Sequence, residues 1–150
     1  MERHRNGLIA LALALAVGCA SADGGKRPDD NAEPRAHVLV QVTESSLEPA
    51  VARVLQGGDV EWGNYANRLA GVVIFPAGIA DDFTCRKLDP RFSKVALGYQ
   101  SAFITAGGGT LDLPCPLKPG TYTYELRLFD ADFASPEDPL FILKGTIAVE

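Results

Sequence analysis

The stretch "PGTYTYELRLFDADF", Pro119 to Phe133, holds the pattern that decides the fold. It opens on a turn signal, because proline presets one backbone dihedral and glycine tolerates a positive φ. Apolar and polar side chains then alternate, and a period of two residues is typical of a strand with one buried face. The stretch therefore predicts a long β-strand followed by an acidic loop. The side chains expected to face the core are Tyr122, Tyr124, Leu126 and Leu128.

The same alternation recurs along the chain. It appears in "HVLVQVTE" (37–44), "DVEWGN" (59–64) and "KGTIAVE" (144–150), whereas "LAGVVIF" (69–75) is almost continuously apolar, as expected for a strand covered on both faces. Turn signals lie between these runs, in "QGGD", "AGGGT" and "LKPGT". Seven or eight short strands at this spacing predict an all-β, antiparallel β-sandwich.

The middle of the predicted domain, residues 78–101, is less regular than the rest. We expect one or two short helical turns here, near Asp81 and Arg91. A segment of this kind between strands is where a sandwich commonly carries its individual features. An aromatic patch formed by this excursion is the place where a binding surface is expected.

Three segments together resemble the cupredoxin family: "GGDVEWGNYANRLAGVVIF" (57–75), "LKPGTYTYEL" (117–126) and the closing "KGTIAVE". Their order along the chain is also that of the family. The resemblance covers Val38 to Glu150 and implies a Greek-key, cupredoxin-like β-sandwich. A sandwich of the Ig-like or transthyretin-like kind remains the alternative, because the "PGTY" turn is common to many such folds.

The resemblance also shows where copper ligands are expected. A type 1 copper site needs two imidazoles and one thiolate, with a weak axial ligand. The family's first histidine falls on Ala70, its cysteine on Leu126 and its second histidine on Phe129. After loss of a signal peptide the chain keeps one histidine, His37, and no methionine. The sequence therefore predicts replaced ligands, no type 1 copper, and no catalytic, cofactor-binding or metal-binding residues.

The N-terminus predicts export. A basic start, "MERHR", precedes the twelve-residue apolar run "GLIALALALAVG", which is too short to span a bilayer and typical of a signal peptide. The run ends in "AVGC", which resembles a bacterial lipobox and implies cleavage before Cys19 and a lipid on it. An ordinary signal peptide, cut after Ala20 or Ala22, is the alternative.

The expected organisation is a lipoprotein signal peptide (1–18), a flexible tether (19–36) and a cupredoxin-like domain (37–150). The tether has no large apolar side chain and is rich in glycine, proline and charge, so it cannot form a core. The chain resembles lipoproteins in which alanine follows the lipid-bearing cysteine, as Ala20 does here, and this resemblance implies sorting to the outer membrane. The expected location is thus the cell envelope, facing the periplasm.

The cysteine count agrees with a lipid anchor. Three cysteines are an odd number for an exported protein, and a lipid on Cys19 leaves Cys85 and Cys115 as a pair. An oxidising compartment would let these two form a disulfide. Two free, buried thiols are the alternative.

Charge and motifs narrow the function classes. Without residues 1–18 the chain has 12 basic and 18 acidic side chains, a net charge of −6, and no basic cluster. Nucleic acid and anionic lipid head groups are therefore poor partners. The acidic stretch after Asp130 lacks the spacing of an EF-hand loop, and no G-x-S-x-G elbow accompanies His37.

These observations favour a non-catalytic binding or structural module. It would be held at the membrane by the lipid on Cys19 and would meet an envelope protein or a small ligand. The alternative is a copper-related accessory or electron-transfer cupredoxin with an atypical site. An enzyme would require a pocket in which Asp81, Asp82 or Asp112 meets a polar partner.

Overall fold

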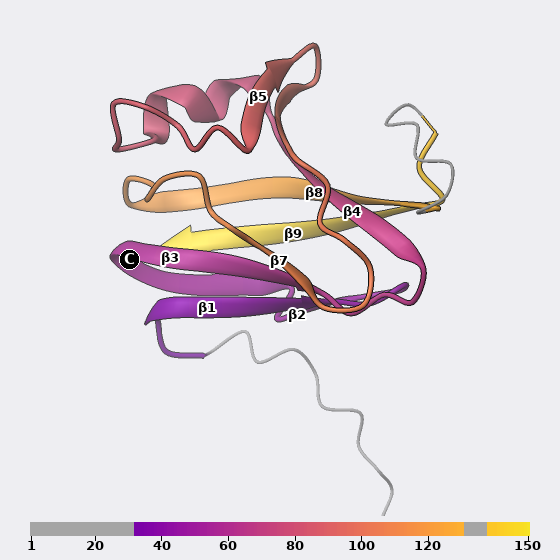
Figure 1. Ribbon diagram of the computed structural model, residues 1–150. Helices are drawn as coiled ribbons and strands as arrows, with labels where there is room; N and C mark the ends of the chain where they lie inside the picture. Colours follow the sequence, from indigo (N-terminus) through magenta and orange to yellow (C-terminus); the bar gives the residue numbers. More distant parts are fainter. Residues whose placement is uncertain (1–31, 131–137) are drawn as a thin grey trace, which may run out of the picture.

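The computed structural model describes residues 32–130 and 138–150 of the chain. Within these two ranges, no helix is long and apolar enough to cross a membrane. The described part consists mainly of strands and the loops between them, with one short 3-10 helix (Figure 1). Its elements are β1 (Arg35–Val42), β2 (Leu47–Glu48), β3 (Val51–Asn64), β4 (Leu69–Phe75), η1 (Ala77–Asp82), β5 (Phe92–Val95), β6 (Gly98–Ser101), β7 (Gly109–Asp112), β8 (Gly120–Asp130) and β9 (Phe141–Val149).

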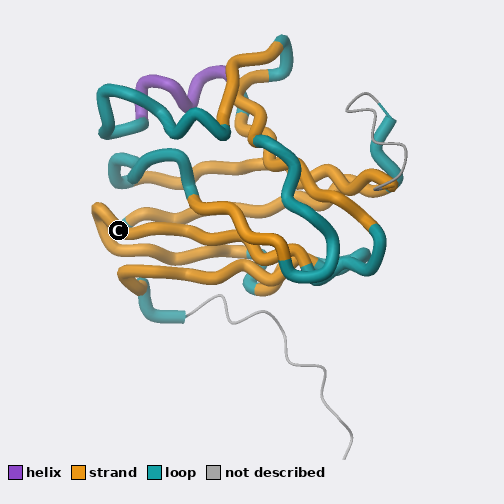
Figure 2. Tube along the Cα trace, viewed as in Figure 1, coloured by secondary structure: helices purple, strands orange, loops and turns teal. Residues whose placement is uncertain are grey.

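The strands form one continuous hydrogen-bonded path that folds over a shared core. The order is β2-β1-β3-β9-β8-β4-β6-β5, and β7 pairs with β3 (Figures 1 and 2). Most pairings are antiparallel, as the sequence predicts, but β3 runs parallel to both β1 and β9. The all-β sandwich predicted from the sequence is confirmed, with these two parallel pairings as an addition.

Strand β3 pairs with different strands along its length. Its first part, Val51–Val54, pairs with β9, and its second part, from Asp59 to Asn64, pairs with β1 and β7. Between the two parts, Gly57 has a φ of +80°, and a Cβ at Gly58 would meet the backbone oxygen of Leu55 at 2.7 Å. The "QGGD" segment, predicted to be a turn between strands, is therefore an irregularity within one strand, where glycine lets the chain change partners.

The centre of the core is formed by side chains from β3, β4 and β8. Trp62 from the second part of β3 meets Tyr124 of β8 edge to face, with ring centroids 5.3 Å apart. The ring of Phe75 on β4 lies 6.0 Å from that of Trp62. The predicted alternation is confirmed between Tyr124 and Leu128, where the inward residues are buried and the residues between them are more exposed; Tyr122 is only partly buried, and Phe129 is buried as well. The strand "LAGVVIF" is buried at every position, as predicted.

The excursion agrees with the prediction in one place and differs in another. A helical turn near Asp81 is confirmed, since η1 spans Ala77–Asp82. Near Arg91 the chain instead enters the β5–β6 hairpin, which adds two strands to the edge of β4. The predicted aromatic patch is wrong, because Phe83 and Phe92 are buried against the core and Tyr99 packs on Phe83. Burial of these large rings stabilises the excursion on the domain, which explains why they are not left on the surface.

The Cys85–Cys115 disulfide predicted from the sequence is present, with the two Cα atoms 5.9 Å apart. It joins the excursion to the segment before β8. The backbone hydrogen bonds from Thr84 to Pro116 (3.0 Å) and from Lys118 to Asp82 (2.9 Å) hold the same two segments together. The disulfide therefore fixes the position of η1 over the end of the sandwich.

Candidate functional site

The positions at which the cupredoxin resemblance places copper ligands are filled by packed apolar side chains. Leu126 is fully buried in the main core, where its strand pairs with Val73 on one side and Leu143 on the other. Ala70 and Phe129 are buried partners across the β4–β8 pair. Leu126 and Phe129 are an odd number of residues apart, so they lie on opposite faces of β8.

Phe129 belongs to a second, smaller cluster of buried residues together with Val72 and Ile74. Its ring meets that of Phe103 edge to face, with centroids 6.0 Å apart. Apolar packing thus occupies both faces of the sheet where the resemblance places the ligands. Among residues 32–130 and 138–150, no group of three or more His, Cys, Asp or Glu side chains is placed to hold a metal ion.

Asn64 is a polar residue beside this region that the sequence analysis did not single out. It is fully buried, and its Nδ2 donates to the carbonyl oxygens of Leu69 (2.8 Å) and Ile104 (3.0 Å). Its Oδ1 accepts from the amide of Ala66 at 3.1 Å. The side chain therefore joins the end of β3, the start of β4 and the segment around Ile104, and a buried amide satisfied in this way is a structural feature. The sequence signal that could have pointed to Asn64 is its position in "EWGN", two residues after Trp62 at the end of a predicted strand.

The buried pair of Trp62 and Tyr124 carries two polar atoms that have no hydrogen-bond partner in the described structure, the indole Nε1 and the phenol oxygen. Burial raises the pKa of Tyr124 to about 12, and a hydrogen-bonding contact from the indole N–H of Trp62, which lies outside normal hydrogen-bond geometry, acts in the opposite direction. The ring of Tyr124 lies over Gly145 of β9, where a Cβ would overlap it. This contact links the glycine of "KGTIAVE" to the second tyrosine of "TYTY".

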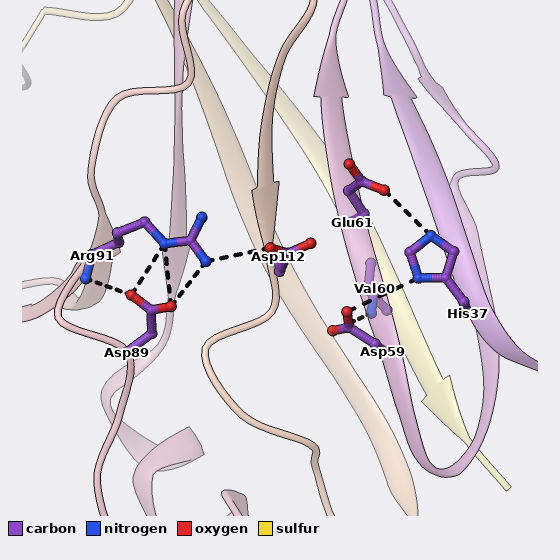
Figure 3. A network of polar contacts seen from close by, with 7 residues as sticks. All are labelled: His37, Asp59, Val60, Glu61, Asp89, Arg91 and Asp112. Atoms are coloured by element: carbon purple, nitrogen blue, oxygen red, sulfur yellow. Dashed lines mark hydrogen bonds and ion pairs between the residues drawn. The ribbon is translucent and has the colours of Figure 1, made fainter.

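His37 lies in β1 beside acidic residues of β3 (Figure 3). Its Nε2 is 3.3 Å from a carboxylate oxygen of Glu61, and its Nδ1 is 4.0 Å from one of Asp59. Burial raises the pKa of Asp59 above its ordinary value, against the hydrogen bond donated by the amide of Val60. About half of the His37 side chain is exposed, and the arrangement is a solvated ion-pair network on the sheet surface.

Two of the acidic residues considered for an alternative enzyme have polar neighbours, and one of them, Asp82, lines a pocket of about 250 Å³ with Thr121 and Tyr122. Asp112 of β7 accepts a 3.4 Å hydrogen bond from Arg91, which also binds Asp89 (Figure 3). Asp81 and Asp82 belong to η1, where their carbonyl oxygens accept from Lys118. Of the acidic loop, Asp132 and Glu137 lie outside the described residues, as do Cys19, the signal peptide and most of the tether.

A groove of about 460 Å³ lies on the face of β4, β8 and β9 that is turned away from the core. The β5–β6 hairpin contributes Leu97, whose side chain is 57% exposed. This volume is in the range of small-molecule sites. The sequence analysis did not find this groove, because it depends on where the hairpin comes to lie. Its other lining residues are Ile74, Pro76, Thr123, Tyr124, Glu125, Arg127, Lys144, Gly145 and Thr146.

The strand pairing and the three sequence segments describe a cupredoxin-like β-sandwich whose expected ligand positions are occupied by core residues. A reduced Cu(I) form of an amicyanin variant is similar in structure, with a TM-score of 0.48 and 17% identity over 79% of this chain and 86% of that one. A reduced auracyanin from the photosynthetic bacterium Roseiflexus castenholzii has a TM-score of 0.45 and 14% identity over 79% of this chain and 99% of that one. No protein-family model and no curated protein sequence matches the chain.

Proposed function

We propose that the chain is a non-catalytic binding module of the cell envelope, held at the membrane by a lipid on Cys19. The observation that carries this proposal is the packing at the replaced positions. Leu126 and Phe129 are almost completely buried, so the shell presents surfaces to partners and no open ligand position. A side chain packed in this way would have to leave the core before an ion could take its place.

The lipid anchor is supported by the "AVGC" segment and by the pairing of the other two cysteines. Of the three cysteines of the chain, Cys85 and Cys115 form the disulfide, and Cys19 is the one that remains for a lipid. A disulfide of this kind is typical of proteins folded outside the cytoplasm. In the proposal the lipid-bearing chain faces the periplasm at the outer membrane, and its partner is an envelope protein or a small ligand.

Metabolic labelling with a clickable palmitate analogue tests the anchor. The wild-type chain should incorporate the label and Cys19→Ser should not, while Ser21→Ala, a matched change two residues away, should label normally. Label on the Cys19→Ser chain, or none on the wild-type chain, would contradict the anchor.

Crosslinking in intact cells tests the binding role. The anchored chain should give the same crosslinked envelope partner in repeated experiments, and Cys19→Ser should lose it through mislocation. The absence of any reproducible product would remove support for a protein partner and leave the small-ligand form of the proposal.

A further inference from the structure

The groove on the outer face of β4, β8 and β9 has an excess of positive charge. Three ionisable side chains line it, one acidic and two basic: Glu125, Arg127 and Lys144. Nε and Nη2 of Arg127 both bind the same oxygen of Glu125, at 3.2 and 2.9 Å. The carboxylate of Glu125 therefore neutralises Arg127 and leaves the charge of Lys144 uncompensated. The groove has a net charge of +1, on a chain whose net charge is −5.

Lys144 supplies the uncompensated charge. It is the cross-strand neighbour of Glu125 in the β8–β9 pair, yet no ion pair of Lys144 occurs among the described residues. Lys144 is exposed, whereas only 16% of the Arg127 side chain is exposed. An ammonium group that is accessible at the wall of a groove is a donor for an incoming anion.

The remaining lining is divided between hydroxyl groups and apolar side chains. Thr123 and Thr146 come from the adjacent strands β8 and β9 and are register partners, so their side chains lie on the same face. Towards β4 and the β5–β6 hairpin, the lining is apolar and comes from Ile74, Pro76 and the exposed Leu97. A groove with a cation and hydroxyls on one side and apolar groups on the other fits a ligand with the same division.

We propose that this groove binds a small amphipathic carboxylate, with its carboxylate at Lys144 and its hydrocarbon part against Leu97 and Ile74. The inference deepens the proposed function, on which it rests, by naming the ligand class of the binding module. A cation would be repelled by the uncompensated charge of Lys144, and a neutral apolar molecule would leave the ammonium without a partner. The combination of charge complementarity and apolar wall therefore favours the carboxylate.

Titration with hexanoate, followed by amide NMR shifts, tests the proposal. The full-length chain carrying Cys19→Ser is used, so that no lipid competes for the probe. Saturable shifts are expected at Thr123, Lys144 and Thr146, with weaker or no shifts for hexanol and hexylamine at the same concentration. Equal shifts with all three probes, or no shifts with hexanoate, would overturn the proposal.

Two substitutions of opposite sign separate charge recognition from a general effect on the fold. Lys144→Gln should weaken hexanoate binding about fivefold, since a partly exposed ion pair contributes about 1 kcal/mol. Glu125→Gln should strengthen it by a similar factor, because it removes the competing carboxylate. Lys87→Gln, the same change at an exposed lysine outside the groove, should leave affinity unchanged. Weakening by Glu125→Gln, or equal effects of Lys144→Gln and Lys87→Gln, would refute the assignment.

The apolar wall has its own test. Leu97→Ser should weaken hexanoate more than propionate, because the longer chain reaches the wall. Equal loss for both acids would contradict the proposed orientation. If no carboxylate binds while crosslinking still captures an envelope partner, the groove inference is wrong and the proposed function stands. If hexanoate binds and no partner is captured, the groove inference stands and the proposal of a protein partner is wrong.

Discussion

Replacing Tyr124 by phenylalanine tests the buried aromatic pair at the centre of the sandwich. The hydroxyl of Tyr124 and Nε1 of Trp62 are both buried, and the contact between them falls short of a hydrogen bond of normal geometry. A buried polar group left unpaired costs about 1–3 kcal/mol relative to one that is paired. Tyr124→Phe removes the hydroxyl and keeps the ring, so at neutral pH we expect unchanged or higher stability, by up to about 1 kcal/mol.

The pH dependence gives the sharper expectation. The pKa of Tyr124 is raised from 10.0 to about 12 in the folded chain. Between these values the folded state keeps the proton and the unfolded state loses it, so stability is fully present below pH 10 and falls as the pH rises towards 12. The loss works out at about 1 kcal/mol by a pH of about 11 and about 3 kcal/mol above both pKa values.

Urea unfolding of both proteins, followed by tryptophan fluorescence at pH 8 and at pH 11, measures this effect. Other titrating groups are shared by the two proteins and cancel in the difference. Tyr124→Phe should lose about 1 kcal/mol less than the wild-type chain between the two conditions. Equal losses would refute the reasoning, and so would a Tyr124→Phe chain that is less stable by more than about 1 kcal/mol at pH 8, since the hydroxyl would then have a partner.

Two further predictions concern the packing and the disulfide. Gly145→Ala should lower the free energy of unfolding by about 1–3 kcal/mol, because the new methyl group would overlap the ring of Tyr124, whereas Gly78→Ala, with open space around it, should change little; equal effects in thermal unfolding would argue against the contact. Replacing Cys85 and Cys115 together by alanine should cost about 3–4 kcal/mol, as expected for a loop of about thirty residues, and a reducing agent should produce the same loss in the wild-type chain alone.

The strands could be predicted from the sequence because burial on one face produces an alternation that is visible in the residues themselves. Tyr124, Leu126 and Leu128 follow that pattern, and all three are in the core. The parallel pairings of β3 could not be predicted this way. They depend on Gly57 and Gly58, which read as a turn in isolation and become an irregularity when both flanking segments find partners.

Some features of the candidate sites could be predicted from the sequence, and others depend on how the chain folds. The apolar residue types at Ala70, Leu126 and Phe129, where the resemblance places copper ligands, and the presence of Cys85 and Cys115 can be read directly from the sequence. The groove joins side chains of β4, β8 and β9 to Leu97 of a hairpin far away in the sequence. The β5–β6 hairpin lies where the sequence predicts a helical turn. Its residue Phe92 is buried and Tyr99 packs against the core, so Leu97 is left exposed beside the groove, which could not be predicted from the sequence.

Copper titration of the purified chain tests the central claim, that a cupredoxin-like shell here serves by contact with partners. With Cu(II) under air and with Cu(I) under reducing conditions, we expect no stoichiometric binding tighter than about micromolar and no intense thiolate-to-copper absorption near ~600 nm. His37→Gln should then have no effect on either titration. An intensely coloured, stoichiometric copper complex of the wild-type chain would contradict the account.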